Sequence, residues 1–498
     1  MNPVDYTQLR HLYINGRWQQ PLSATYQTVC NPATEEPIGE APLGGVADLD
    51  AAIVAAREAF DHGPWPTLSI AARIACIKRF RDCLQRRHRE VSAVLQAEVG
   101  VTQLLLNGPQ FQGALEAIDY CLQLAAELKP HSNEVIINPS LLDPNSSGTL
   151  GGSLTVYEPY GVVAAISAYN YPLLLNIAKL APALLAGNCL ILKPSPLTPF
   201  SALLLGAIAD EAELPAGVFN IVTGAVDVGS ALTADPRVDL ISFTGSDSVG
   251  AAILEQSAKN LKKVHLELGG KSAMIVRHDA DIALAAANAA FNFTLHAGQG
   301  CALLTRFIVH NSVRAEFVQA VCQLLGQLKV GDPSEPDTVI GPLISAAALS
   351  KTEHYVQMGL EGGAKLAFGG SRPAHLSRGF FFTPTLFDDV DNGSLLAQQE
   401  VFGPIGAVIG FDSDDEAVAL ANDSNYGLSG AVFSQDKVTA FKLAQKIRSG
   451  DVKINGGTGG LNFSAPFGGY KRSGIGREFG PHWLHEYLLE KAIHYPIG

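Results

Sequence analysis

The stretch GVVAAISAYNYPLLLNIAKLAPALLAGNCLILK, residues 161–193, decides the fold class. A short β-branched and apolar run at residues 162–166 precedes an amphipathic stretch at 173–185, and a second short run follows at 190–193. Short apolar runs between turn residues are typical of buried strands, whereas longer periodic runs are typical of helices. The stretch therefore predicts a strand, a helix and a second strand parallel to the first.

The same alternation continues to Glu267 and then starts again. Further strands are expected at residues 218–222, 240–243 and 264–267, and further helices at 202–211 and 248–258. After Gly270 the pattern predicts strands at 273–276 and 306–309, and helices at 282–295 and 313–328. An open parallel sheet with helices on both faces collects its ligands beyond the carboxyl ends of its strands. A second α/β domain is expected to begin near residue 271.

Two segments do not follow this alternation. Residues 134–137 and 154–157 flank a turn-rich stretch, and the tail at 487–497 also has a strand pattern. These segments either complete a sheet on another subunit or form an intramolecular hairpin and a frayed tail, and both readings remain open.

The predicted fold class is therefore α/β, with an open parallel-sheet dinucleotide-binding domain, a second α/β catalytic domain and a small β oligomerisation segment. The boundaries expected from the sequence are residues 1–130 and 160–266 for the cofactor-binding domain, 267–465 for the catalytic domain, and 131–159 and 479–498 for the oligomerisation segments.

Bulk composition restricts the classes of function. The 498 residues carry a formal net charge of -13, which argues against a nucleic-acid partner because such proteins need a basic surface. The seven cysteines contain no C-x-x-C pair and no zinc-ligand spacing, so no metal site is predicted. An odd number of cysteines and the absence of a signal pattern or a membrane span favour the cytoplasm. The expected partner is a small molecule.

Cys301 is the candidate nucleophile. It follows Gly298-Gln299-Gly300, and glycine at two of these positions lets a large planar ligand approach the backbone. A lone cysteine is more often a small buried hydrophobic residue, so the neighbouring motifs decide between the two interpretations.

Glu267 and Asn170 are candidates to act beside that thiol. Glu267 ends a predicted strand, where a carboxylate in apolar surroundings can serve as a base on water. Asn170 also follows a strand, and its amide could donate to an oxyanion. The plainer readings are an ion-paired surface glutamate and a turn residue ahead of Pro172.

Two glycine-containing turns are candidate phosphate sites. Residues 224–229 and 245–250 each follow a strand and precede a helix start, whose free N–H groups attract anions. Gly270-Lys271-Ser272 resembles the end of an ATP-binding loop, but that motif needs glycine where this chain has His265.

Taken together, these residues resemble the aldehyde dehydrogenase superfamily of hydrolytic, NAD(P)-dependent enzymes, over nearly the whole chain from Tyr13 to Glu478. The motifs occur in the order of that family: Glu158-Pro159-Tyr160-Gly161, Tyr169-Asn170-Tyr171-Pro172, Leu192-Lys193-Pro194-Ser195, Phe243-Thr244-Gly245-Ser246, Glu267-Leu268-Gly269-Gly270-Lys271, Gly298-Gln299-Gly300-Cys301, Glu400-Val401-Phe402-Gly403-Pro404 and Pro466-Phe467-Gly468-Gly469-Tyr470-Lys471.

The resemblance implies oxidation of an aldehyde to a carboxylic acid through a thioester on Cys301, with Glu267 as general base and Asn170 as oxyanion donor. It implies cofactor contacts from Ile166, Ser167, Tyr169, Lys193, Ser195, Pro196, Gly224, Gly229, Phe243, Thr244, Gly245, Ser246, Val249, Leu268, Gly269, Glu400 and Phe402. By position in the family motifs, the substrate pocket is expected to contain Tyr171, Ala178, Leu295, Leu303, Leu461 and Phe467.

Departures from the family pattern bear on specificity. Pro196 stands where most NAD-using members have glutamate, so we expect the enzyme to accept NADP as well as NAD, and a preference for NADP stays open. Ala178 replaces a bulky aromatic residue of several small-aldehyde enzymes, and Ala168-Tyr169 replaces the commoner Pro-Trp. The expected pocket contains no cation, which favours medium-chain aliphatic or aromatic aldehydes over semialdehydes that carry a carboxylate.

Two other functions compete with this one. A CoA-acylating semialdehyde dehydrogenase shares the fold but lacks the glutamate base, so Glu267 argues against it. A catalytically silent homologue is opposed by the presence of all three candidate catalytic residues. We also expect the chain to form a homodimer or a homotetramer.

Overall fold

The first sheet follows the predicted strand–helix alternation. The computed structural model describes residues 4, 6–143, 145–457 and 460–497. Its central strands β8 (Val162–Ile166), β9 (Cys189–Lys193), β10 (Phe219–Ile221), β11 (Leu240–Thr244) and β12 (Lys263–Glu267) are parallel and lie in the order β10-β9-β8-β11-β12. This is the order of a doubly wound dinucleotide-binding sheet, with its switch point between β8 and β11.

Short antiparallel strands complete both edges of this sheet. β1 (Leu12–Ile14) and β2 (Arg17–Gln19) extend the β10 edge, and β22 (Gly474–Ile475) pairs with β12. Five helices pack against the strands of this sheet: α1 (Val46–Asp61), α6 (Pro172–Ala186), α7 (Pro199–Glu211), α8 (Val226–Ala234) and α9 (Asp247–Ala258). Three further helices pack on α6 and α7 rather than on the sheet: α2 (Ile70–Arg86), α3 (His88–Val99) and α5 (Gln112–Glu127). The short helix α4 (Gln103–Leu105) lies between α3 and α5 in the chain.

The ends of α6 show how local sequence sets an element next to the site. The helix begins at Pro172, where a fixed φ and a missing N–H are both tolerated. It is capped at its C-terminal end by Gly187, whose φ of +98° would be strained for a residue with a side chain. Asn170 and Tyr171 therefore lie in the short turn between β8 and this helix.

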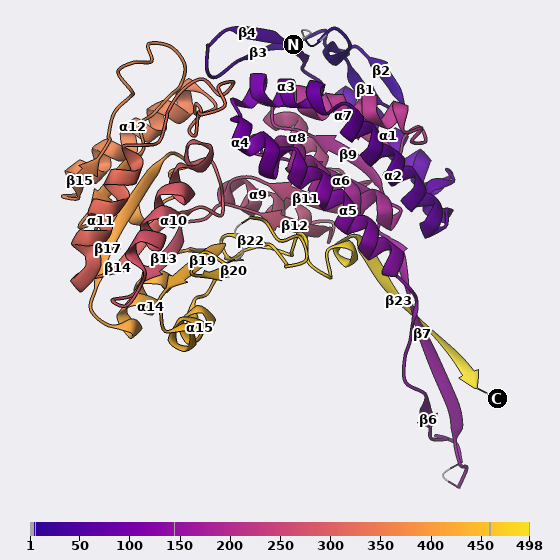
Figure 1. Cartoon of the computed structure of the whole chain (residues 1–498). Helices are drawn as coiled ribbons and strands as arrows, with labels where there is room; N and C mark the ends of the chain where they lie inside the picture. Colours follow the sequence, from indigo (N-terminus) through magenta and orange to yellow (C-terminus); the bar gives the residue numbers. More distant parts are fainter. Residues whose placement is uncertain (1–3, 5, 144, 458–459, 498) are drawn as a thin grey trace.

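The second sheet forms the second lobe in Figure 1. It contains, in spatial order, β15 (Lys365–Phe368), β16 (Thr385–Asp388), β17 (Ile405–Phe411), β14 (Leu304–His310), β13 (Ser272–Val276), β19 (Ser429–Phe433) and β20 (Asp451–Ile454), all parallel except β15. Its helices are α10 (Ile282–Thr294), α11 (Asn311–Leu325), α12 (Ala346–Glu361), α13 (Leu395–Gln398), α14 (Asp414–Asn422) and α15 (Lys437–Lys446).

The remaining elements are short. They are the hairpin β3 (Tyr26–Cys30) and β4 (Pro37–Pro42), the pair β18 (Tyr426–Gly427) and β21 (Tyr470–Lys471), and the helical turns η1 (Gln8–Arg10), η2 (Trp65–Thr67), η3 (Leu106–Gln110), η4 (Leu295–Gly298) and η5 (Leu484–Tyr487). Within the described ranges, no helix combines the length and the apolar character needed to cross a membrane.

A third, small sheet projects from the first lobe as an arm (Figure 1). β7 (Thr149–Pro159) pairs with β23 (Leu488–Ile497) on one side, and with β5 (His131–Ser132) and β6 (Ile136–Asn138) on the other. The two sequence segments outside the α/β pattern therefore pair with each other within one chain. Nearly all of β23 is exposed.

The expected start of the C-terminal arm segment at residue 479 is wrong. The arm strand begins at Leu488, whereas Phe479, Trp483 and Tyr487 are buried in the core of the first lobe. Burial of three large aromatic side chains favours this placement, because each removes a large apolar surface from water. Residues 479–487 thus belong to the first domain.

Candidate active site

The predicted cofactor residues gather at the carboxyl edge of the first sheet. Ile166 and Ser167 end or follow β8, Lys193 ends β9, and Phe243 and Thr244 end β11. The others lie in the turns and helix starts directly beyond these strands: Tyr169, Ser195, Pro196, Gly224, Gly229, Gly245, Ser246, Val249, Leu268 and Gly269. Because the five strands are parallel, all these positions meet at one edge.

This edge fits a dinucleotide. Ser167 directly follows β8 and Thr244 ends β11, the two strands that flank the switch point. Ser167 Oγ and Thr244 Oγ1 are both buried without a hydrogen-bond partner in the described part of the chain. Buried hydroxyls are normally paired, so these two are available to a ligand. The start of α9, where Ser246 Oγ accepts from Val249 N, also offers free N–H groups to a phosphate.

Lys193 lies close to the turn that leads to Pro196. Its side chain is buried, which lowers the pKa of its ammonium group to about 8, and Nζ donates to Pro194 O at 3.4 Å. Gln27 Nε2 donates to Pro196 O at 3.1 Å and so ties this turn to β3. A cation therefore stands beside a tethered turn that carries no carboxylate at position 196.

The two domains meet at the link between β12 and β13. Gly270 N donates to Glu400 Oε1 at 2.9 Å, which brings a carboxylate of the second domain to the end of the first sheet. A Cβ at Gly269 would lie 2.3 Å from Glu400 Oε2, and a Cβ at Gly270 would lie 2.6 Å from Cys301 O. Only glycine fits at either position, so this link packs directly against Glu400 and Cys301.

Asn170 forms hydrogen bonds with three residues from two separate parts of the chain. Its backbone oxygen accepts from Gln110 Nε2 at 2.7 Å and contacts His296 Nε2 at 2.8 Å. Its side-chain Nδ2 donates to Gln299 O at 2.9 Å, two residues before Cys301. An amide nitrogen carries two hydrogens, so a second N–H remains for an oxyanion. Asn170 is thus hydrogen-bonded, across the boundary between the two domains, to the turn that precedes Cys301.

His296 and Gln110 were not predicted from the sequence. Burial lowers the pKa of His296 to about 4, so its ring is neutral near pH 7. His296 and Ala297 have φ values of 53° and 54°, a backbone conformation that side chains rarely adopt. The strained turn η4, which precedes Cys301 in the chain, thus positions the His296 imidazole next to Asn170 O.

The surroundings of Cys301 oppose its ionisation. Burial, followed by the negative charges of Glu400 and Glu267, raises the pKa of the Cys301 thiol to about 12. Burial raises the pKa of Glu400 to about 7. Both carboxylates therefore act electrostatically on the Cys301 thiol.

Glu267 is almost completely buried at the end of β12. Burial, and then the charge of Glu478, raises its pKa well above the ordinary range of a glutamate. Glu478 forms a buried ion pair with Lys179 Nζ at 2.8 Å, between residues 299 positions apart in the chain. A carboxylate with a raised pKa is a stronger base than an exposed one.

The remaining predicted residues are placed with different degrees of exposure. Tyr171 lies close enough to Cys301 for the thiolate charge to add to burial in raising its pKa, and its ring is 5.3 Å from that of His296. Tyr169 and Phe402 stack edge to face at 5.8 Å across the two domains. Ala178 is fully buried in α6, Leu303 is buried, Leu295 and Phe467 are half-buried, and Leu461 is 44% exposed.

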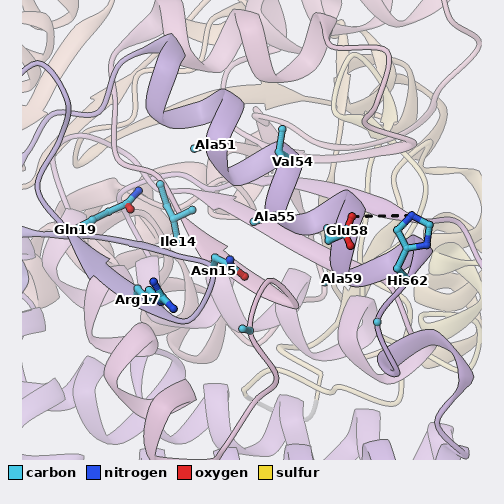
Figure 2. Close-up of a pocket in the computed structure, with 12 residues that line it drawn as sticks. Ile14, Asn15, Arg17, Gln19, Ala51, Val54, Ala55, Glu58, Ala59 and His62 are labelled. Carbon is cyan, nitrogen blue, oxygen red and sulfur yellow. Dashed lines mark ion pairs between the residues drawn. The ribbon is translucent and has the colours of Figure 1, made fainter.

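Figure 2 shows a surface cavity of about 620 Å³ that lies away from these residues. It is lined by α1 and by the β1–β2 hairpin, and it contains the Glu58–His62 ion pair at 4.0 Å. β1 and β2 form the edge of the first sheet opposite to β12 and β22. The cavity is therefore remote from Glu267 and does not include the predicted site.

The doubly wound sheet and the second α/β domain define a two-domain oxidoreductase that uses a nicotinamide dinucleotide. The sequence model of the aldehyde dehydrogenase family matches residues 18–493, and the chain belongs to this family. The protein is thus an enzyme that oxidises aldehydes to carboxylic acids.

Individual relatives cover nearly the whole chain. The geranial dehydrogenase of Castellaniella defragrans is 38% identical over 485 residues, which are 97% of this chain and 98% of the relative. The Mycobacterium tuberculosis aldehyde dehydrogenase complexed with NAD+ superposes with a TM-score of 0.92 at 40% identity, covering 98% of both chains. A mutant of aldehyde dehydrogenase C from Pseudomonas syringae, in complex with NAD+ and octanal, gives a TM-score of 0.92 at 38% identity, covering 98% of this chain and 97% of that chain.

The raised pKa of Cys301 predicts how its reactivity depends on pH. Because only the thiolate is alkylated, the rate of iodoacetamide labelling without cofactor should rise about tenfold per pH unit between about pH 7 and pH 9. Mass spectrometry of the Cys301 peptide measures this rate, and Cys301→Ala identifies the signal. A labelling rate that levels off within this interval would contradict the prediction.

Proposed function

We propose that this enzyme acts through a thioester on Cys301, with Asn170 as oxyanion donor and Glu267 as the base for hydrolysis. The observation that carries the proposal is the hydrogen bond from Asn170 Nδ2 to Gln299 O, because it ties the amide to the turn that holds Cys301. The influence of Glu267 on the Cys301 thiol supports the placement of the base in the same site.

In the proposed reaction, the Cys301 thiolate forms a bond to the aldehyde carbon. The free N–H of the Asn170 amide and the Cys301 backbone N–H stabilise the oxyanion that develops. Bound NAD or NADP supplies the hydride acceptor at the carboxyl edge of the sheet. The acyl group then remains on Cys301 Sγ as a thioester.

Glu267 completes the proposed cycle. Its carboxylate takes a proton from water, the water oxygen attacks the thioester carbon, and the C–S bond breaks to release the acid. Its raised pKa strengthens the carboxylate as a base, but it also means that the carboxylate form must be reached before hydrolysis. Hydrolysis is therefore expected to accelerate with rising pH.

Two substitutions separate the two halves of this reaction. Cys301→Ser should lower kcat by at least about a thousandfold, because a serine hydroxyl is far less ionised than a thiol. Glu267→Gln should retain a rapid burst of about one reduced cofactor per active site and then stall, since only the hydrolytic base is lost. Stopped-flow absorbance of the reduced nicotinamide measures both.

Cys322→Ser is the matched control, because Cys322 is a partly exposed cysteine on α11. It should keep wild-type kcat. Normal steady-state turnover by Cys301→Ser would refute the proposed nucleophile, and normal turnover by Glu267→Gln would refute the proposed base.

We propose that the substrate is a medium-chain aliphatic or aromatic aldehyde. The predicted pocket residues Tyr171, Leu303 and Phe467 are aromatic or aliphatic, and no lysine or arginine is among the six. An apolar lining favours an apolar chain and gives a carboxylate no charged partner. The octanal complex of the Pseudomonas syringae enzyme and the geranial dehydrogenase of Castellaniella defragrans support this class.

The substrate class predicts a rank order. Octanal and benzaldehyde should each exceed succinic semialdehyde by about tenfold or more in kcat/KM, since burying an unpaired carboxylate costs more than burying a methyl group. The comparison uses initial rates with one cofactor held at saturation. A preference for succinic semialdehyde would overturn the proposed class.

We propose further that the enzyme accepts NADP as well as NAD. NAD+ complexes of the structural relatives support NAD as a cofactor. At position 196 a proline replaces a carboxylate that would repel a 2′-phosphate, and Lys193 provides a cation nearby. A water in place of the missing carboxylate would leave NAD the better cofactor, which is the alternative outcome.

Pro196→Glu tests this choice. The new carboxylate should lower kcat/KM for NADP by about one to two powers of ten relative to NAD, through repulsion of the 2′-phosphate and a hydrogen bond to the ribose. Pro196→Ala is the matched control, because it removes the ring without adding charge and should change the ratio little. A wild-type preference for NAD above about tenfold that Pro196→Glu leaves unchanged would contradict the proposal.

The proposed assembly is a homodimer or homotetramer in the cytoplasm. The arm sheet supports self-association, because the exposed strand β23 leaves an edge with unpaired backbone groups. All seven cysteines are free thiols, which supports a reducing compartment.

A further inference from the structure

His265 has no role in the reaction described above, but it forms a buried pair with Glu267. They are two residues apart on β12, so their side chains leave the strand on the same face. Only 1% of His265 and 3% of Glu267 is exposed, and His265 Nε2 lies 3.4 Å from Glu267 Oε1. Within β12, the imidazole of His265 is thus the polar group next to the proposed base.

Neither side chain has another hydrogen-bond partner within residues 4, 6–143, 145–457 and 460–497. Both ring nitrogens of His265 and both carboxyl oxygens of Glu267 are buried and unpaired. A buried polar group without a partner costs about 1–3 kcal/mol, so four such atoms side by side call for an explanation. A small rotation of either side chain would shorten the 3.4 Å contact to hydrogen-bond distance.

Two glycines of the neighbouring segment make room for the pair. Gly476 has a φ of +91°, and a Cβ there would lie 2.3 Å from His265 Cδ2. Gly468 has a φ of +151°, and a Cβ there would lie 2.8 Å from Glu267 Oε1. The backbone therefore packs closely against both side chains, and only glycine at these two positions leaves room for them.

The charged groups around the pair come from several elements. α6 contributes Lys179, β12 contributes Lys263, and the segment after β22 contributes Arg477 and Glu478. Glu486 of η5 also acts on Glu267. Burial, and then the positive charges of Lys179, Lys263 and Arg477, holds the pKa of His265 well below its usual range. The ring is therefore neutral, with one N–H to donate.

We propose that His265 is a positioning residue for Glu267: its Nε2–H donates to Glu267 Oε1 and orients the carboxylate toward the water that releases the acid. This inference rests on the proposed role of Glu267 as the hydrolytic base. A donor to the carboxylate stabilises its charged form, so His265 offsets part of the burial that opposes ionisation. His265 thus extends the pH range in which the base is active toward lower pH.

The sign of the effect follows from this balance. Removing the donor disfavours the carboxylate, so the pKa of Glu267 rises further and the acid limb of hydrolysis moves to higher pH. A hydrogen bond to a charged group corresponds to a displacement of about one pH unit. Hydrolysis below the midpoint should slow by about tenfold, whereas formation of the acyl-enzyme should change little.

The experiment follows hydrolysis directly in the full-length enzyme. Wild type and variants are mixed with NAD and octanal, excess aldehyde is removed, and decay of the acyl-Cys301 mass is followed by intact-protein mass spectrometry across a pH series. His265→Leu should move the midpoint of the acid limb up by about one pH unit. His265→Gln can place an amide N–H near the position of Nε2, so its midpoint should lie close to that of the wild type.

Two further variants keep the test decisive. Tyr487→Phe removes a buried hydrogen bond to Ser242, the cross-strand neighbour of His265, without removing a partner of Glu267, so the midpoint should stay in place. If His265→Leu does not fold, His265→Thr replaces it, because a β-branched residue suits a strand and its hydroxyl is too short to reach the carboxylate. The proposal would be overturned if the midpoint were unchanged in His265→Leu, or in His265→Thr where that replaces it. It would also be overturned if His265→Gln shifted the midpoint as much as that variant does.

Failure of the underlying function has a different signature. If Glu267→Gln hydrolysed the acyl-enzyme at the wild-type rate, both the role of Glu267 as the base and the His265 proposal would be refuted. Blocked hydrolysis in Glu267→Gln, together with an unmoved midpoint in His265→Leu, would refute His265 alone.

Discussion

The site depends on the shortness of the link between the two sheets. β12 ends at Glu267 and β13 begins at Ser272, so four residues carry the chain from one sheet to the other. Two of the four are glycines, at positions where a Cβ would overlap Glu400 or closely approach Cys301 O. Because the link is short and has no side chains at Gly269 and Gly270, the end of the first sheet packs directly against Glu400 and the turn that holds Cys301. Every other feature of the site is arranged around this contact.

Close packing at the link has an electrostatic consequence. It places two buried carboxylates close enough to one thiol for their charges to act on it, and all three groups have pKa values raised toward their neutral forms. Lys271, at the end of the same link, is shifted in the opposite direction, to a pKa of about 7, because burial disfavours its charge. Glu400 and Lys271, whose pKa values are both about 7, can gain or lose a proton near neutral pH, whereas ionisation of the Cys301 thiol is opposed there.

Local patterns in the sequence identified most of the scaffold. β8 agrees at both ends with the predicted strand, and α6 differs by one residue at each end, because alternating runs and helix boundaries are encoded within short windows. The support of the site is not local. Gln110 and His296 reach Asn170 from 60 and 126 residues away, and Lys179 reaches Glu478 across 299 residues. No periodic pattern in the sequence predicts contacts between residues so far apart in the chain. His265 is different, because its position two residues before Glu267 on a predicted strand already implies a shared face.

The groups that hold the site and the groups that react in it are of different electrostatic kinds. Asn170 is fixed by the amide of Gln110 and by His296, whose pKa of about 4 keeps it neutral across the ordinary range. The hydrogen bonds that set the position of the oxyanion donor therefore do not change as the solution is titrated. Glu267 and Cys301, in contrast, must ionise for the proposed reaction to proceed, and their surroundings oppose it. A neutral framework around titrating groups lets pH control the rate of each step without altering the geometry, which is why pH profiles are the most direct readout of this site.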